Sequence, residues 1–406
     1  MENALIQNRD FIIFGLQPWD IPIGSNCKNI AAEIAKHNRV LYVNRPLDRI
    51  TSLKKRNDQQ TKNRLESIKK GKAVLTKIDE QLWVLNPRIM LESINFLPPG
   101  FFYNYLNKSN NKKLAAAISE AAGTLNFKDP ILLTDNDFFN GLYLKEYLKP
   151  SFFIYYIRDY ILSQKYFLRH GTTAEPLMIK KANVVAANSQ YLANYAGKYN
   201  PNSADIGQGC EVEEFLEPPA QYPEDLNKIG FPRIGYCGSL TATRLDIRLL
   251  HFIASEQPNW NIVLVGPEDD AFRQSDLHTL KNVYFLGSKQ PAELPAYTHS
   301  FDVCINPQLL NQMTIGNYPR KVDEYLAAGK PVVATKTETM GIFGEAVYLC
   351  DTYQEYLVQI QKAMQQAKNT EKIAERKKLG MSHTWAASVT KLYKLIIKYS
   401  NHDRKS

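Results

Sequence analysis

The most informative stretch of this chain is PRKVDEYLAAGKPVVAT, from Pro319 to Thr335. It has the pattern of a short helix, a glycine that ends it, and a buried strand opened by Pro331. Lys321 and Glu324 are three residues apart, so they share one face of that helix. A lysine ammonium can bind a diphosphate while the neighbouring carboxylate accepts both ribose hydroxyls. We therefore expect a nucleotide site at the start of this helix.

Short apolar runs alternate with helical patterns on both sides of this stretch, which is typical of βαβ units. The runs are nearly continuous in apolar residues, as expected for parallel strands that helices cover on both faces. They predict an α/β fold with two Rossmann-like sheets. The expected strands are 11–14, 40–43, 82–85, 131–133, 152–157 and 184–187, then 233–236, 261–265, 283–286, 302–305 and 331–334.

A length of 406 residues favours two domains, because single cores rarely grow beyond about 250–300 residues. The loop over 200–231, rich in proline, glycine and acidic residues, is the expected boundary. We expect domains over 1–205 and 206–385, followed by a C-terminal helix over 386–406 that crosses back onto the first domain.

The 50 Lys and Arg residues against 41 Asp and Glu give a net charge of +9, which favours anionic partners. The basic run over 49–72 has almost no aromatic residues, so a nucleic-acid partner is not expected. Five scattered cysteines without a CxxC pair predict neither a zinc site nor a disulfide framework. No stretch approaches 18 apolar residues and no signal peptide is evident, so we expect a cytoplasmic protein.

The 319–335 segment resembles the nucleotide-binding motif of GT-B glycosyltransferases of family 4, where Lys-x-x-Glu-Tyr-Leu-Ala-x-Gly-Lys-Pro-Val-Val is frequent. GYCGSL at 235–240, VLVGPED at 263–269 and the segment 282–307 look like landmarks of the same domain, in order and spacing. FGLQPWD at 14–20 and YYIRDY at 155–160 look like weaker landmarks. The overall pattern is similar to bacterial enzymes that make surface polysaccharides or teichuronic-type polymers.

The resemblance implies a GT-B fold with two Rossmann-like domains facing a cleft, an acceptor-side N-terminal domain and a nucleotide-sugar-binding C-terminal domain. It also implies a metal-independent hexosyltransferase without a cofactor, which uses a UDP- or GDP-sugar as co-substrate. Transfer would retain the sugar configuration without a protein nucleophile, mainly by stabilising the leaving diphosphate. The acceptor would be a glycan or lipid-linked glycan.

The same resemblance assigns site residues. Those expected to hold the nucleotide sugar are Gly238, Ser239, Gly266, Pro267, Glu268, Asn317, Lys321 and Glu324. Those expected to act in catalysis are Asp159, which orients the acceptor or the donor sugar, and Arg244 and Lys321, which bind the diphosphate. Those expected on the acceptor side are Gly15, Trp19 and Asp20.

Two departures from the family pattern shape these assignments. Many members carry a glutamate where this chain has Gly316, and an arginine where it has Ser239. The diphosphate charge is therefore assigned to Arg244 and Lys321. The backbone N–H groups over 313–316, together with Asn317, are expected to contact the donor instead, as a loop before a helix can do.

Simpler interpretations stay open for most of these residues. Lys321 and Glu324 can form a surface ion pair, Arg244 can be solvated, and Gly238 and Gly266 can serve only tight turns. Asp159 can cap a helix or pair with Arg158, and His170 fits an ordinary surface histidine.

At the level of function, the alternatives are a non-catalytic GT-B subunit that binds a glycan or a partner, and a nucleotide-sugar epimerase. No GxxxxGK[ST], GxSxG or HExxH pattern points to another enzyme class. The basic run over 49–72 and the aromatic stretch over 94–105 suggest peripheral contact with the inner face of an anionic membrane. The alternative is a solvated loop beside buried core aromatics.

Overall fold

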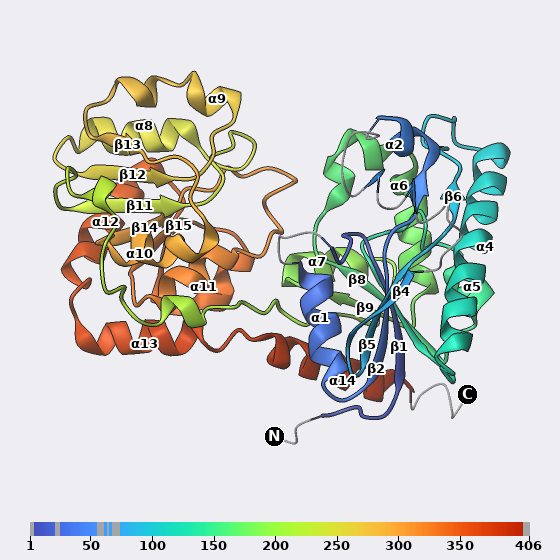
Figure 1. The fold of residues 1–406 in the computed structure, drawn as a ribbon. Helices are drawn as coiled ribbons and strands as arrows, with labels where there is room; N and C mark the ends of the chain where they lie inside the picture. Colours follow the sequence, from blue (N-terminus) through green and yellow to red (C-terminus); the bar gives the residue numbers. More distant parts are fainter. Residues whose placement is uncertain (1–3, 21–24, 55–60, 63–64, 67–73, 401–406) are drawn as a thin grey trace. The chain divides into compact units, whose positions relative to one another are not determined.

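The computed structural model describes residues 4–20, 25–54, 61–62, 65–66 and 74–400. The chain divides into two compact units, which are described here one at a time (Figure 1). Unit 1 comprises Met1–Gly207 together with Trp385–Ser406, and unit 2 comprises Gln208–Thr384.

Unit 1 is built on an eight-stranded sheet in the order β10-β9-β8-β7-β1-β2-β5-β4. All neighbours are parallel except β4 and β5. The strands are β1 (Asp10–Gly15), β2 (Arg39–Val43), β4 (Val74–Asp79), β5 (Leu82–Asn86), β7 (Ile131–Asp135), β8 (Phe152–Ile157), β9 (Val184–Ala187) and β10 (Ser203–Asp205), with a separate pair β3 (Leu47–Asp48) and β6 (Met90–Leu91). The strands predicted for this half are all present. The edge strand β4 was not predicted, because its largely exposed residues form no continuous apolar run.

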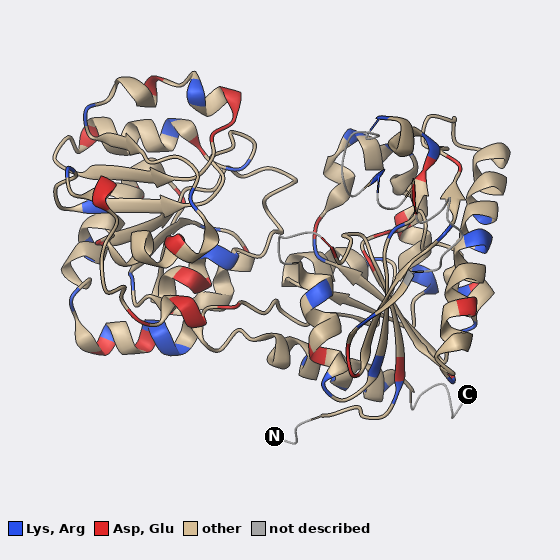
Figure 2. Ribbon diagram, in the orientation of Figure 1, with Lys and Arg blue, Asp and Glu red and all other residues tan. Residues whose placement is uncertain are grey.

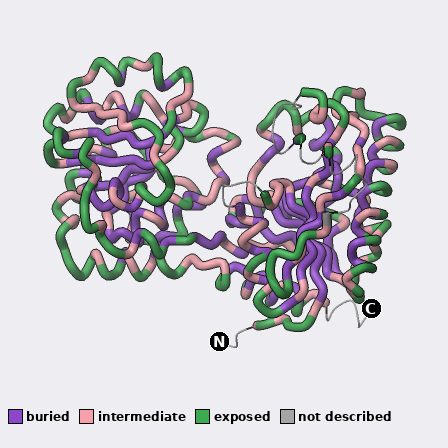
Figure 3. The backbone as a smooth tube through the Cα atoms, in the orientation of Figure 1, coloured by how far each residue is buried: buried purple, intermediate pink, exposed green. Residues whose placement is uncertain are grey.

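Helices cover both faces of this sheet, and its inner strands are almost wholly buried (Figure 3). They are α1 (Asn26–Ala35), α2 (Arg49–Lys54), α4 (Phe101–Thr124), α5 (Leu144–Leu148), α6 (Lys165–Lys181), α7 (Gln190–Gly197) and α14 (Trp385–Ser400), with a 3-10 turn η1 (Ile161–Ser163). Ser25 caps α1 by accepting a hydrogen bond from the Lys28 N–H at 3.2 Å. Leu392 and Ile396 of α14 pack into the same core as α1. The expected return of the C-terminal helix to the first half of the chain is thereby confirmed.

Unit 2 contains a six-stranded, wholly parallel sheet in the order β13-β12-β11-β14-β15-β16. Its strands are β11 (Arg233–Cys237), β12 (Asn261–Val265), β13 (Val283–Phe285), β14 (Val303–Asn306), β15 (Val332–Thr335) and β16 (Val347–Cys350). Its main helices are α8 (Ile247–Glu256), α9 (Asp270–Arg273), α10 (Leu294–His299), α11 (Arg320–Ala327), α12 (Tyr353–Gln365) and α13 (Thr370–Gly380). The expected strands of this half are present, and β16 is added beyond them.

In each sheet, successive strands are added first on one side of the first strand and then on the other, so the strand order reverses once. In unit 1 the chain adds β2 on one side of β1 and later β7 on the other, and in unit 2 it adds β12 and then β14 around β11. Ligands of open α/β sheets bind outside the carboxyl ends of the strands at such a reversal. The loops after β1, β7 and β11 are therefore the places to look for function.

All five cysteines are buried and free. His170 is only 3% exposed and its ring stacks on Tyr103 at 3.7 Å, so the interpretation as a surface histidine is wrong. Among the described residues, no helix combines the length and the apolar character needed to cross a bilayer.

Candidate functional site

Helix α11 carries Lys321 and Glu324 and is held firmly against the sheet of unit 2. Val322, Tyr325 and Leu326 are fully buried on its inner face. The hydroxyl of Tyr325 accepts a hydrogen bond from the Cys237 N–H at 2.9 Å, which ties the helix to the end of β11. The first turn of α11 therefore lies at the reversal point of this sheet.

The ammonium of Lys321 lies directly against Gly238, the residue after β11. A Cβ added to Gly238 would lie 2.2 Å from the Lys321 Nζ, and Gly238 has a φ of +145°, which favours glycine. Gly238 thus makes room for the lysine as well as for a turn. In the described part of the chain, no carboxylate lies within ion-pair distance of Lys321.

The charges of three side chains act on the buried side chain of Tyr236, which lies on β11. The Lys321 Nζ lies 5.5 Å from the ring centre. Burial raises the pKa of the Tyr236 hydroxyl, the charges of Lys321 and Arg244 act to lower it, and Glu324 acts to raise it. In turn, Tyr236 is the main cause that raises the pKa of Lys321, although burial opposes it. Lys321 therefore lies beside Tyr236 and keeps its charge, and the charges of Arg244 and Glu324 act on the same tyrosine.

Glu324 does not pair with Lys321. Its carboxylate is 15% exposed and accepts a hydrogen bond from the Arg320 Nε at 3.1 Å, so the interpretation as a Lys321–Glu324 surface pair is wrong. Burial raises the pKa of Glu324, although Lys321 and Arg320 act against it. A carboxylate that has lost most of its water, and has one guanidinium partner, gains from further donors such as a pair of hydroxyls.

The loop after β11 carries Ser239 and Arg244, both exposed. The carbonyl of Arg244 accepts a hydrogen bond from the Leu309 N–H at 2.8 Å. The amide of Asn311 donates to the Thr243 carbonyl at 2.9 Å. These bonds fix the backbone beneath Arg244 while its guanidinium stays at the surface.

The loop after β12 packs tightly on the loop after β11. A Cβ added to Gly266, whose φ is +150°, would lie 1.9 Å from the Gly238 carbonyl oxygen. The Pro267 carbonyl accepts a hydrogen bond from the Leu240 N–H at 2.8 Å. Glu268, expected to hold the nucleotide sugar, instead has its carboxylate 2.9 Å from the His278 Nε2. The two glycines therefore share one tight junction, whereas Glu268 already has a partner within unit 2.

Asn311, which the sequence interpretation did not single out, organises the loop before α11. Its Oδ1 accepts hydrogen bonds from the N–H groups of Met313 at 2.8 Å and Thr314 at 3.1 Å. Its carbonyl accepts from Ile315 at 3.0 Å. The expectation that backbone N–H groups over 313–316 contact the donor is therefore wrong for 313–315. Asn317 is half-buried just ahead of α11, near Lys321 in the sequence.

In unit 1, the predicted acceptor-side residues follow β1. A Cβ added to Gly15 would lie 2.0 Å from the Tyr42 hydroxyl, so the strand end and this tyrosine are in close contact. The Trp19 ring packs edge-on against Tyr42 at 5.1 Å, and the Trp19 backbone N–H donates to the Asn44 Oδ1 at 2.7 Å. Asp20 is exposed and borders 21–24, which lie outside the described residues. Gly15 and Trp19 are thus brought together around Tyr42.

Asp159 belongs to an ion-pair network at the ends of β7 and β8. The guanidinium of Arg158 lies 3.4 Å from Asp159 and 3.0 Å from the fully buried Asp135. Burial raises the pKa of Asp135, and Arg158 acts against it. The Oδ1 of Asn136 accepts hydrogen bonds from the Arg158 and Asp159 N–H groups at 2.7 and 3.1 Å. The expected alternative pairing with Arg158 is present, yet the Asp159 side chain is 42% exposed.

Asp135, Asn136 and Arg158 were not predicted as site residues. The signal that would have found them is a polar residue immediately after an apolar strand, as in ILLTDN and FFIYYIR. The sequence carries a weaker signal for Tyr236, because an aromatic residue inside a strand usually belongs to the core. Among the described residues, no group of three His, Cys, Asp or Glu is arranged to hold a metal ion.

Comparison with known proteins bears on the fold and the family. Residues 231–374 match the family model described as "Glycosyl transferases group 1". The solved structure of Anabaena HepE in complex with UDP superposes with a TM-score of 0.65 at 17% identity, over 96% of this chain and 99% of that one. Sucrose-phosphate synthase from Thermosynechococcus elongatus gives 0.64 at 14% identity, over 96% and 100%. The fold is that of the GT-B glycosyltransferases, as expected.

A curated relative gives a narrower likeness. Over 173 residues the chain is 30% identical to TuaH of Bacillus subtilis (strain 168), which carries the name of a teichuronic acid biosynthesis glycosyltransferase. The match covers 40% of this chain and 43% of TuaH, so it spans less than half of either protein. The resemblance to GT-B glycosyltransferases is thereby confirmed, whereas assignment to family 4 in particular stays a prediction.

Proposed function

We propose that this protein is a glycosyltransferase whose unit 2 binds a nucleotide-sugar donor, with UDP- or GDP-sugars as the first candidates. The observation that carries the proposal is the ammonium of Lys321, which lies against Gly238 at the sheet reversal of unit 2 and has no carboxylate within ion-pair distance among the described residues. HepE, which has the same fold, is described in complex with UDP and with UDP-glucose.

In the proposed reaction, Glu324 accepts hydrogen bonds from the ribose hydroxyls, and Lys321 and Arg244 face the diphosphate. Their positive charge stabilises the leaving group as the bond from the sugar to the diphosphate breaks. Asp159 orients the acceptor or the donor sugar. We propose transfer with retention of configuration, no protein nucleophile and no divalent metal. Activity is then expected to survive excess EDTA.

We further propose a role in surface polysaccharide synthesis, with a glycan or lipid-linked glycan as acceptor. The name of TuaH supports this role, although that likeness covers less than half of each chain. The proposed location is the cytoplasm, at the inner face of the membrane. Much of the basic run over 49–72, namely 55–60, 63–64 and 67–72, lies outside the described residues.

Exposed aromatic residues support the membrane contact. Phe96, Phe101 and Phe102 are 63%, 78% and 76% exposed, so the interpretation of this stretch as buried core is wrong for these residues. Leu53 on α2 is also 72% exposed. Apolar side chains of this kind can enter a membrane interface, and lysines and arginines attract anionic headgroups.

A thermal-shift screen against UDP-, GDP-, ADP- and TDP-sugars tests the central proposal, because a ligand that binds only the folded state raises the unfolding temperature. One nucleotide class is expected to raise it, and Lys321→Ala is expected to abolish the rise. Product analysis with that donor and a cell-envelope extract should then show a transferred sugar. Binding without transfer would favour the non-catalytic subunit, and an isomerised donor sugar would favour the epimerase.

A further inference from the structure

Unit 1 contains a cavity of about 500 Å³ that none of the predicted site residues lines. Its walls come from α2, α4, α6 and the loops that follow β2, β6 and β7. Small-molecule sites have volumes of roughly 300–1,000 Å³ and combine apolar walls with a few convergent polar groups. The size of the cavity fits one or two sugar rings, so its lining decides what it can bind.

Two of the asparagines that line this cavity have hydrogen-bonding atoms for which the described residues of unit 1 supply no partner. The amide nitrogen of Asn95 donates to the Tyr166 carbonyl at 2.9 Å, which leaves its Oδ1 as an acceptor. The Oδ1 of Asn107 lies 3.2 Å from the amide nitrogen of Asn111, which leaves its Nδ2 as a donor. Among the described residues, both remaining atoms are buried without a partner, and Asn107 is only 2% exposed.

Leaving a buried donor and a buried acceptor unpaired is costly, so such atoms usually mark a place that a ligand or water fills. A sugar hydroxyl both donates and accepts, so it satisfies either atom. Tyr103, Phe139 and Tyr166 add aromatic walls beside the two amides. The negative face of an aromatic ring suits the C–H face of a pyranose. Amides and rings together indicate a carbohydrate.

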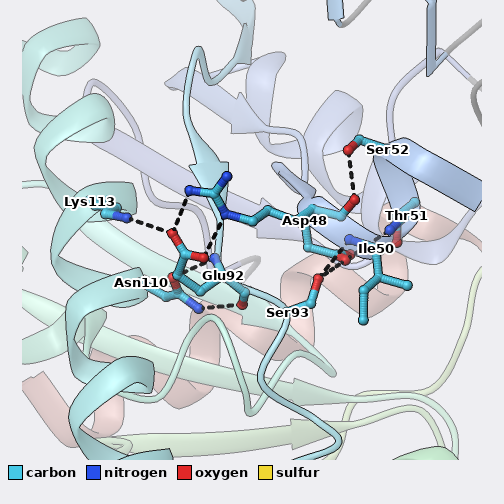
Figure 4. A network of polar contacts seen from close by, with 9 residues as sticks. Asp48, Ile50, Thr51, Ser52, Glu92, Ser93, Asn110 and Lys113 are labelled. Atoms are coloured by element: carbon cyan, nitrogen blue, oxygen red, sulfur yellow. Dashed lines mark hydrogen bonds and ion pairs between the residues drawn. The ribbon is translucent and has the colours of Figure 1, made fainter.

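The charges that line the cavity do not cancel. Figure 2 shows basic and acidic segments together around α2 and β6. The acidic side chains there already have partners. Glu92 binds Arg49 at 2.7 Å. Figure 4 shows that Glu92 also binds Lys113, at 3.6 Å, and that Asp48 binds Thr51, at 2.6 Å, and Ser93.

The positive side chains from α6 are different. Lys165 opens α6, and Arg169 lies one turn later on the same helix and lines the same cavity. Arg169 donates to the Phe96 carbonyl at 2.9 Å, and neither residue has a carboxylate within ion-pair distance in the described ranges. The start of a 17-residue helix adds partial positive charge at the same place. An anionic group on the ligand would compensate this charge.

We propose that this cavity binds a sugar unit carrying a carboxylate or phosphate, with the amides of Asn95 and Asn107 on its hydroxyls and Lys165 and Arg169 facing its acidic group. That this sugar belongs to the acceptor rests on the proposed glycosyltransferase function. The binding itself does not, so the two can be tested separately.

The test is calorimetric titration of the full chain with glucuronate, glucose 1-phosphate, methyl glucoside and inorganic phosphate. At least one of the two acidic sugars is expected to bind at least about tenfold more tightly than methyl glucoside and phosphate, because it alone engages both the amides and the cations. Whichever acidic sugar binds more tightly shows whether the site prefers a carboxylate or a phosphate. The proposal is overturned if neither acidic sugar binds, or if methyl glucoside or phosphate binds as tightly.

Variants locate the binding. Lys165→Gln and Asn107→Leu are each expected to weaken it about tenfold or more, whereas Lys112→Gln, an exposed charge loss on α4 away from the cavity, should leave it unchanged. Unchanged affinity in Lys165→Gln contradicts the proposal even if Asn107→Leu fails to fold, since Lys165 is exposed. Lys321→Ala should lose nucleotide binding and keep acidic-sugar binding. If nucleotides fail to bind the intact protein while acidic sugars do, the proposed function falls and this site stands.

Discussion

Arg158 in unit 1 and Lys321 in unit 2 are both cations at the carboxyl ends of parallel strands, but they differ in their partners. Arg158 lies between two carboxylates, at 3.0 Å from Asp135 and 3.4 Å from Asp159. No carboxylate of the described chain lies within ion-pair distance of Lys321. The two carboxylates neutralise the charge of Arg158, whereas the charge of Lys321 would be neutralised by a bound anion. The comparison indicates that the Arg158–Asp135 pair chiefly supports the fold of unit 1, whereas the charge of Lys321 in unit 2 is available to an anionic ligand.

The largest expected effect follows from removing the central cation of the unit 1 network. Arg158→Ala should lower the free energy of unfolding by about 3–5 kcal/mol, because it leaves the fully buried Asp135 without its charged partner. Urea unfolding followed by circular dichroism measures the change. The matched control is Arg273→Ala, whose partner Asp270 is 87% exposed, and it should cost less than about 1 kcal/mol. A similar small loss in Arg158→Ala would remove the contrast between the two units.

A second buried carboxyl of unit 1 should make stability depend on pH. Burial raises the pKa of Glu175 from 4.5 to about 7, although hydrogen bonds from Tyr195 and Tyr155 act against it. Between these values the folded protein keeps a proton that the unfolded chain has released. Its free energy of unfolding should therefore fall as pH rises from about 4.5 to 7, by up to about 1.4 kcal/mol per pH unit.

Urea midpoints between pH 5 and 8 measure this slope, and Glu175→Gln should flatten it. Glu120→Gln, an exposed change on α4, should leave the slope as it is. If the wild type and Glu175→Gln respond to pH in parallel, Glu175 is not held protonated in the folded state.

For unit 2 the expected effect is on binding rather than on folding. Glu324→Ala should weaken nucleotide affinity by about 2 kcal/mol, roughly 30-fold, through loss of charge-assisted hydrogen bonds to the ribose. Calorimetry with the nucleotide identified in the thermal-shift screen measures it. Glu375→Ala, whose partner Lys372 is half exposed, is the control and should bind normally. A folded Glu324→Ala protein with unchanged affinity would refute the ribose assignment.

The smallest expected effect sharpens the role of the glycine beside Lys321. Gly238→Ala places a methyl group 2.2 Å from the Lys321 Nζ, so the ammonium must move and nucleotide affinity should drop about tenfold. The matched control is Gly341→Ala, where an added Cβ meets no atom within 4 Å. Equal affinity in the two variants would show that Gly238 serves only the turn.

Local patterns were enough to predict much of this molecule. The apolar runs marked the strands of both sheets except β4, β10 and β16, because a parallel strand buried on both faces needs a continuous apolar sequence. The spacing of Lys321 and Glu324 placed both on the first turns of α11, since helical periodicity is fixed by the backbone. The helical pattern over 386–406 likewise predicted a C-terminal helix that returns to the first domain.

Which side chains contact one another was decided only by the tertiary structure. The partner of Glu324 is Arg320 rather than Lys321, because the orientation of α11 against β11 turns the lysine toward Gly238 and Tyr236. Glu268 faces His278, and the cavity of unit 1 gathers Asn95, Asn107 and Lys165 from separate segments. Sequence determines which side chains a strand or helix can present to one face. Which of them meet, and which are left for a ligand, depends on how those elements pack.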